Sequence, residues 1–326
     1  MNEMTEQGSR PSVTIGISTY NRAARTLPQA LESALAQTYE PIEILVCDNA
    51  STDGTDQLVG AIQDQRLHYH RHPENIGANA NFNACLNLAQ GDYFILLHDD
   101  DLLEPGCVER AMTVVTGVKE PGILLSGVRL IDAEGEPRGT KPPPPADLTG
   151  AELFKRWFQR EFSFYLVSTI FHTQRLRSAG GFQSPENLFQ DVVALARLAA
   201  RYGYVSVPGC GGAFRRHDES RTTASHAMRW ARDAAYLLDV LCEEFPDAAA
   251  SLRTVGAPYL TNTSYRRAES EASWLKRHKL YREIYALFGR SLHPWRYLWR
   301  LRIRKAQRRV KRLIAGNAQT NRSFDR

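Results

Sequence analysis

Apolar runs that end in polar residues alternate with helical patterns over the first hundred residues. Strands are predicted from apolar or β-branched runs at 13–17, 42–47, 67–70 and 93–97. Helices are predicted from the spacing of apolar residues at 27–35, from 56 onward and at 82–89. Strands that alternate with helices are typical of a parallel sheet with right-handed crossovers. The pattern therefore predicts an α/β fold.

Polar residues follow three of these strands. They are residues 18–21, Asp48, and the three consecutive aspartates at 99–101. Ligands of parallel sheets bind at the carboxyl ends of the strands, so we expect the three clusters to meet in one crevice. Each cluster alone could be a solvated loop, and the aspartates could simply cap the helix that Pro105 starts. Three clusters in register favour a binding site.

The aspartate triplet suggests a divalent-metal site. Neighbouring carboxylates raise one another's pKa unless a cation neutralises them. The sequence has neither GxGxxG nor GxxxxGK[ST], so a diphosphate would need another source of positive charge, and a metal held by Asp100 would supply it. Asp48, a lone acid at a strand end, suits acceptance of an imide or amide proton from a base.

The order and spacing of several motifs resemble glycosyltransferase family 2, the inverting nucleotide-sugar transferases with the GT-A fold. The motifs are Ser-Thr-Tyr-Asn-Arg at 18–22, Cys-Asp-Asn-Ala-Ser-Thr-Asp-Gly-Thr at 47–55, Asn-Ile-Gly at 75–77, Gly-Asp-Tyr at 91–93 with the aspartate triplet and Pro105, Gly-Gly-Phe at 180–182, Gln190-Asp191, Arg197-Leu198, and Arg-Arg-His at 215–217. The resemblance covers roughly residues 12–224. It implies a GT-A type, Rossmann-like, mostly parallel central sheet with flanking helices, followed by a helical C-terminal region.

The resemblance also implies roles for residues of the donor site. Ser18, Thr19 and Tyr20 would wall the base pocket, and Asp48 would hydrogen-bond the pyrimidine. Asp99 would hold the ribose. Asn81, the last residue of the Gly- and Asn-rich stretch 75–81, is counted with these nucleotide-sugar-binding residues.

Asp100 stands in the family's DxD position, so the resemblance implies that it binds magnesium or manganese beside the diphosphate. Asp101 and His217 are the further candidate metal ligands, and His217 is expected near the diphosphate. The longer form of the motif usually begins with an acid where this chain has His98. This departure favours Asp100 as the ligand and leaves the role of Asp101 open.

Asp191 is the candidate general base, since an inverting transfer needs one group to take the proton of the acceptor hydroxyl. It stands in the position of the family's Glu-Asp pair, with Gln190 replacing the glutamate. We expect its place at a helix start to lower its pKa and make it a milder base. The alternative is a carboxylate that only stabilises the helix dipole.

The chain is predicted to divide at about residue 224. Residues 12–105 form the nucleotide-sugar half and 106–224 the acceptor half of one domain, in which the four prolines at 142–145 are either an acceptor-side loop or a stiff connector. Residues 225–315 are predicted to be helical, and 1–10 and 316–326 flexible. With 43% hydrophobic residues in 326, the composition is ordinary for a soluble globular protein.

Cysteines and apolar runs point to the cytoplasm. The five cysteines form no CxxC pair, so we expect reduced thiols. No apolar run has the length of a signal peptide or a membrane span, so the protein is predicted to be neither secreted nor transmembrane.

The net charge of +5 is unevenly distributed. Residues 275–326 carry 16 Lys and Arg against two acids, a net +14, and residues 1–274 carry 25 against 34, a net −9. The last predicted helix has an apolar stripe among these cations, at Trp295, Trp299, Ile303, Ala306, Val310 and Leu313. Basic amphipathic helices with tryptophan are typical of anionic membrane surfaces. A helix packed on its own domain is the alternative; a nucleic-acid partner is disfavoured because no binding fold accompanies the tail.

Taken together, these features predict a metal-dependent, inverting glycosyltransferase of hexosyltransferase type. It would move a sugar from a UDP- or dTDP-sugar to a hydroxyl of a saccharide or lipid-linked acceptor, in bacterial-type cell-surface polysaccharide or glycolipid assembly. The protein would lie on the inner face of the cell membrane. The alternatives are a non-catalytic nucleotide-sugar-binding scaffold and a sugar-nucleotide pyrophosphorylase, although the Gly-rich, Arg-containing first loop of the latter class is missing.

Overall fold

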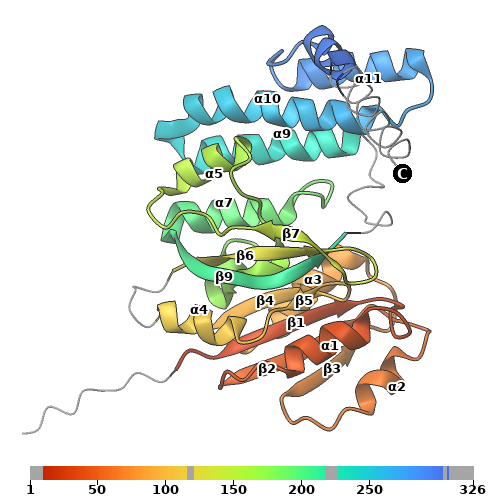
Figure 1. The fold of residues 1–326 in the computed structure, drawn as a ribbon, viewed down its shortest axis with the longest axis vertical. Coiled ribbons are helices and arrows are strands. Elements are labelled where there is room, and N and C mark those ends of the chain that lie inside the picture. Colours follow the sequence, from red (N-terminus) through yellow and green to blue (C-terminus); the bar gives the residue numbers. More distant parts are fainter. Residues whose placement is uncertain (1–9, 116–120, 217–226, 304–306, 308–326) are drawn as a thin grey trace, which may run out of the picture.

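The computed structural model describes residues 10–115, 121–216, 227–303 and 307 (Figure 1). Within them one mixed sheet forms the centre of the molecule. Its strands are β1 (Val13–Thr19), β2 (Ile42–Asp48), β3 (Leu67–Arg71), β4 (Tyr93–His98), β5 (Leu102–Leu103), β6 (Ile123–Ile131), β7 (Pro137–Lys141), β8 (Thr169–His172) and β9 (Tyr204–Arg215). They lie in the order β3-β2-β1-β4-β8-β6-β9-β5, and β7 pairs with β6.

Four neighbouring strands, β3, β2, β1 and β4, are parallel. Val13 of β1 pairs with Ile42 of β2 and Tyr93 of β4, so these three strands start level with one another. Beyond β4 the sheet is mixed, because β8 is antiparallel to both β4 and β6, whereas β6 and β9 are parallel. Residues 166–168 form a 3₁₀ turn, and β8 begins directly after it at Thr169.

Helices lie on both faces of this sheet and in further layers beyond one of them. They are α1 (Leu27–Leu35), α2 (Thr55–Gly60), α3 (Ala78–Leu88), α4 (Cys107–Val115), α5 (Gly150–Phe158), α6 (Thr173–Ser178), α7 (Gln190–Tyr202), α9 (Ala227–Glu244), α10 (Ala249–Ala268) and α11 (Trp274–Leu287). Side chains of β4 alternate between two cores: Tyr93, Ile95 and Leu97 pack on the face of α1 and α4, and Phe94 and Leu96 on the face of α3 and α7. Burial on both faces explains the continuous apolar run of β4.

The C-terminal helices stack on one side of the sheet. In Figure 1, α7 lies between the sheet and the layer of α9 and α10, and α11 lies beyond that layer. The core beneath α7 is continuous with residues of α9 and α10, and so includes residues on both sides of the predicted boundary at 224. Residues 294–303 are helical as well. The predicted α/β fold, with a mostly parallel sheet, flanking helices and a helical C-terminal region, is confirmed.

Candidate active site

The carboxyl ends of β1, β2 and β4 meet as the sequence pattern predicted. Thr19 pairs with Asp48, and Ser18 pairs with both Cys47 and His98. The loops after β1 and β2 are joined by hydrogen bonds: the Asn21 N–H donates to the Ser51 hydroxyl at 2.9 Å, and the Thr52 N–H donates to Asn21 Oδ1 at 2.8 Å. These bonds hold two of the three polar segments in a fixed relation.

Asp48 is completely buried at the end of β2. Its Oδ1 accepts from the N–H and hydroxyl of Ser51, and its Oδ2 accepts from the Tyr69 hydroxyl at 2.6 Å. The Arg71 Nε lies 3.6 Å from the same Oδ2. A carboxylate has about four acceptor positions, so these partners leave little capacity for a base. Contact between Asp48 and a pyrimidine stays a prediction.

Asn81 joins two strands from its place on α3. It is buried, and its Nδ2 donates to the Ser18 hydroxyl and to the carbonyl of Cys47, both at 2.8 Å. Its Oδ1 lies 3.0 Å from His72 Nε2. Asn81 therefore orients Ser18 and His72.

Tyr20 and Asp99 lie side by side where β1 and β4 end. Tyr20 is 46% exposed, whereas Thr19 before it is buried. The Tyr20 N–H donates to Asp99 Oδ2 at 3.2 Å. Burial, and then the charge of Asp100, raise the pKa of Asp99 to about 6.

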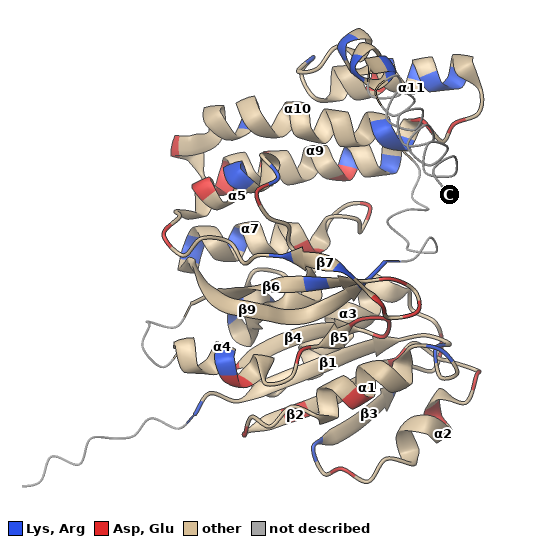
Figure 2. Ribbon diagram, viewed as in Figure 1, with Lys and Arg blue, Asp and Glu red and all other residues tan. Residues whose placement is uncertain are grey.

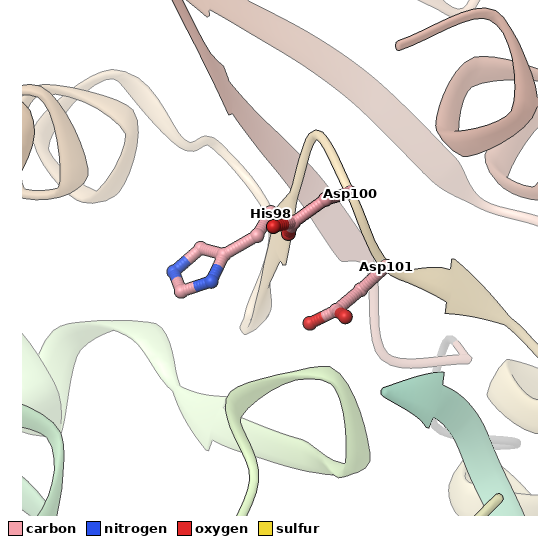
Figure 3. Close-up of side chains that lie close together, drawn as sticks. All are labelled: His98, Asp100 and Asp101. Carbon is pink, nitrogen blue, oxygen red and sulfur yellow. The ribbon is translucent and has the colours of Figure 1, made fainter. Parts of the chain in front are cut away.

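His98, Asp100 and Asp101 form a possible metal-binding cluster on the connection between β4 and β5 (Figure 3). One ligand atom from each lies within 4.8 Å of the others. Ligands of one magnesium ion lie about 2.1 Å from it and therefore roughly 3–4 Å apart, so a small adjustment of the side chains would fit one ion. Burial and the Asp100 charge raise the pKa of Asp101, which is what a carboxylate pair without a cation should show.

The chemistry of this donor set suits a hard or borderline divalent cation. Carboxylates are the usual ligands of magnesium and manganese, and an imidazole adds a ligand preferred by transition metals. His98 was noted in the sequence only as a departure from the family's acid, and the structure brings it into the cluster. Its ring stacks on Phe82 with centroids 4.9 Å apart.

Arg215, at the end of β9, forms hydrogen bonds with the turn that carries Asp100 and Asp101. Its side chain is almost completely buried. The Arg215 N–H donates to Asp101 Oδ1 at 2.9 Å, and its Nε donates to the Asp100 carbonyl at 2.8 Å. Its other nitrogens donate to the Ala133 carbonyl and to Gln29 Oε1. The guanidinium thus connects β9, the aspartate turn, the β6–β7 turn and α1.

Asp191 lies in the first turn of α7, as predicted, but its pKa moves in the opposite direction to the one expected. Burial raises the pKa to about 6, and the charge of Asp233 adds to this rise. The N–H groups of Val192 and of Asp191 itself act in the opposite direction and are outweighed. The error came from counting the helix N-terminus and leaving out desolvation. The raised pKa makes Asp191 a stronger base.

The sequence missed several side chains that surround the predicted site. Tyr69, Arg71 and His72 reach Asp48 or Asn81 from the end of β3, and Arg215 supports the aspartates. A signal was present for the first three, because β3 is a fourth parallel strand ending at the same edge of the sheet. His217 lies outside the described residues, as do Ala306, Val310 and Leu313 of the tail.

The amino-terminal part of the chain is similar in sequence to a known protein family. Residues 14–142 match the family model for glycosyl transferase family 2. The putative glycosyltransferase EpsE of Bacillus subtilis (strain 168) is 32% identical over 130 residues, which are 39% of this chain and 46% of EpsE. A second relative is the Escherichia coli UDP-Glc:alpha-D-GlcNAc-diphosphoundecaprenol beta-1,3-glucosyltransferase WfaP. It is 39% identical over 89 residues, 27% of this chain and 35% of WfaP. The matched stretch is thus less than half of either relative.

Similarity to a solved structure extends much further along the chain. The crystal structure of S. aureus TarS 1–349 in complex with UDP-GlcNAc superposes with a TM-score of 0.67, covering 88% of this chain and 82% of that one. The sequence identity is 16%, so the likeness concerns the fold. Residues 1–224 make up about 69% of the 326 residues, so a superposition over 88% of the chain includes part of the C-terminal helical region.

Proposed function

The chain belongs to glycosyl transferase family 2, and from this premise we propose that it is a metal-dependent, inverting glycosyltransferase. The donor is a UDP- or dTDP-sugar, and the acceptor is a hydroxyl of a saccharide or lipid-linked saccharide in cell-surface polysaccharide or glycolipid assembly. The observation that carries the proposal is the grouping of His98, Asp100 and Asp101 beside the joined ends of β1 and β2. The acceptor class is supported by the printed name of WfaP, whose acceptor is a diphosphoundecaprenol-linked sugar.

The donor occupies the crevice at the strand ends in this proposal. Ser18, Thr19 and Tyr20 wall the base, and Asp99 accepts from the ribose. Asp48 and Asn81 shape the pocket through the hydrogen bonds described above. Asp100 and Asp101, with His98 beside them, would hold a divalent metal. The resemblance adds His217 near the diphosphate, a residue that lies outside the described ones. A bound magnesium or manganese ion would neutralise the diphosphate and stabilise it as a leaving group.

Asp191 acts as the general base. The acceptor oxygen forms a bond to the anomeric carbon as the bond from that carbon to the diphosphate oxygen breaks on the opposite face, which inverts the configuration. The diphosphate leaves with the bonding electron pair, and the carboxylate of Asp191 takes the proton of the acceptor hydroxyl. A base whose pKa is about 6 is ionised at neutral pH and still basic enough to accept this proton.

We also propose that the protein works at an anionic membrane surface, bound through its C-terminal helices. Trp295 and Trp299 are 63% and 57% exposed, whereas Tyr297 between them is buried in the core. Trp274 and Leu275, at the start of α11, are exposed as well. Figure 2 shows the basic residues of α11 as blue bands at the end of the molecule away from β3. No helix of the described residues is long and apolar enough to cross a membrane.

The test of the transfer reaction is a panel of UDP- and dTDP-sugars, assayed for nucleotide release with and without manganese. We expect release from one donor class, stimulated by manganese and lost in Asp100→Ala because the cluster then lacks a carboxylate. Asp239→Ala is the control and should keep the activity, because Asp239 lies in an exposed ion pair with Arg253 on α9. Donor binding without any release would instead indicate a non-catalytic scaffold, and formation of nucleotide triphosphate from pyrophosphate a pyrophosphorylase.

A further inference from the structure

A short segment precedes Asp191, the proposed base. The carboxylate of Asp233, on a helix distant in the sequence, accepts hydrogen bonds from this segment. The segment is residues 184–189, and α7 starts directly after it. The N-cap residue of α7, Phe189, makes no side-chain cap of its own. Instead the N–H groups of Leu188 and Phe189 both donate to Asp233 Oδ2 on α9, each at 2.8 Å.

Two more hydrogen bonds join the same carboxylate to this segment. The Ser184 hydroxyl donates to Asp233 Oδ2 at 2.7 Å, and the Glu186 N–H donates to Oδ1 at 3.0 Å. Asp233 has no exposed surface. A buried carboxylate is tolerated only where donors surround it, and here all four donors come from one six-residue stretch. Asp233 therefore binds this segment specifically, and its burial is not explained by helix packing alone.

Residues of α9 next to Asp233 also contact the segment, through ion pairs and an aromatic contact. Glu186 forms ion pairs with Arg229 at 2.7 Å and Arg232 at 2.8 Å. The ring of Phe189 lies against Trp230, with centroids 4.5 Å apart. One face of α9 thus contacts the segment through a buried carboxylate, two guanidinium groups and an aromatic ring.

We propose that Asp233 is a positioning residue for Asp191, so that α9 of the C-terminal region sets the direction of the base in the acceptor site. This inference rests on the proposed function, because it assigns Asp191 the role of base. It places a determinant of catalysis outside residues 14–142, which match the family model, and outside the motifs that resemble the family. A segment held at four points leaves the side chain that follows it little freedom of orientation.

Asp233 and Asp191 also interact electrostatically. The Asp233 carboxylate adds to the raised pKa of Asp191, after burial. Among the described residues, the other charged groups around the segment are Glu186 with its partners Arg229 and Arg232, and Arg267 of α10, whose guanidinium lies 3.5 Å from the ring centre of Trp230. Removing the charge of Asp233 should therefore lower the pKa of Asp191.

The main test is Asp233→Asn. We expect kcat for transfer to fall about 10²-fold, as for a displaced catalytic group, with the KM for the donor unchanged. The acidic limb of the pH profile of kcat should move below its wild-type position. A merely structural residue would lower the melting temperature and weaken donor binding together with kcat, and the limb would stay in place. That result, or a wild-type kcat in a folded variant, would overturn the proposal.

Two further variants complete the design. Ser184→Ala removes one of the four donors and no charge, so kcat should fall only several-fold and the acidic limb should not move. Asp239→Asn is the matched control, because Asp239 lies on α9 in an exposed ion pair with Arg253, and it should behave as wild type. If Asp233→Asn does not fold, Ser184→Ala combined with Glu186→Gln takes its place, and an unchanged kcat in that variant would refute the proposal.

Amide hydrogen exchange separates this inference from the proposed function. Faster exchange at Leu188 and Phe189 in Asp233→Asn supports the contact even if the wild-type protein transfers no sugar from any donor tested. Unchanged protection of these two amides would overturn the positioning role, whatever the activity.

Discussion

At the scale of single residues, environment determines what each carboxylate of this chain can do. Asp191 and Asp99 both have a pKa of about 6, each raised first by burial. Asp48, with four groups around its two oxygens, is held in place by hydrogen bonds and an ion pair. Asp100 lies on an irregular turn and forms a cluster with His98 and Asp101. The five aspartates thus have four expected roles: general base for Asp191, ribose contact for Asp99, shaping of the base pocket for Asp48, and metal binding for Asp100 and Asp101.

The proposal that Asp191 is the general base predicts how transfer depends on pH. The base must be ionised, so kcat should rise with pH through about 6 and level off above pH 7. Asp191→Asn should lower kcat by ~10²–10⁴-fold, keep donor binding and remove this limb from the residual rate. Steady-state kinetics between pH 5 and 8 would measure both effects.

The control for this prediction is a second acid in a first helical turn. Glu152, in the capping box of α5, serves that purpose. Glu152→Gln should weaken the helix start slightly and leave kcat unchanged. An equally large loss of kcat in both variants would mean that Asp191 acts only on its helix.

At the scale of elements, the site depends on how strands from different parts of the chain are fastened to one another. Asn81 joins α3 to β1 and β2, and Arg215 joins β9 to the turn between β4 and β5. These contacts lie directly behind the residues proposed to bind the donor and the metal. The stability of the sheet and the geometry of the site are therefore coupled.

Replacing Arg215 tests this coupling. Arg215→Met keeps most of the side-chain volume but leaves the Asp100 and Ala133 carbonyls without their donor and Asp101 without its positive neighbour. The free energy of unfolding should fall by about 3 kcal/mol. Urea unfolding would measure the loss, and manganese should bind more weakly.

The matched control for this variant lies on the β6–β7 hairpin. Arg138 pairs with Asp132 on the surface, and its side chain is largely exposed. Arg138→Met should barely move the unfolding midpoint, because exposed ion pairs contribute little. Equal destabilisation by the two substitutions would contradict the role assigned to Arg215.

At the scale of the whole molecule, charge and exposed aromatic residues are concentrated at the C-terminal end. Residues 294–303 present opposite faces to core and solvent, with Tyr297 inside and Trp295 and Trp299 outside. Tyr265 of α10 also donates its hydroxyl hydrogen to the Leu292 carbonyl. Removing the chain after Leu292 would therefore uncover core residues, and point substitutions on the outer face are the sharper test.

We expect Trp295→Ser combined with Trp299→Ser to weaken binding to vesicles that contain anionic lipid, and high salt to weaken it further in the wild type. Transfer to a water-soluble acceptor should be unchanged, because neither tryptophan belongs to the core. Co-sedimentation at low and high salt is the measurement. Leu88→Ser, at an exposed apolar position on α3, is the control. If the double variant co-sediments with anionic vesicles as well as the wild type does, the outer face of residues 294–303 does not bind the membrane.

The sequence by itself determined the α/β class, most element positions and the meeting of polar segments at the ends of β1, β2 and β4. Hydrophobic periodicity and strand-end motifs are properties of consecutive residues, so they can be recognised without coordinates. The same holds for the family, whose motifs are short and ordered along the chain. For β4 even burial on both faces could be predicted, because its apolar run does not alternate.

Only the tertiary structure decided how those residues are surrounded. The pKa of Asp191 depends on desolvation by elements packed around α7, and a local argument from the helix start gave the wrong direction. Asp233 lies 44–49 residues beyond the groups that it accepts from, and Arg215 lies 186 residues from Gln29. Desolvation and long-range hydrogen bonds arise when distant segments pack together, so they cannot be predicted from the pattern of neighbouring residues.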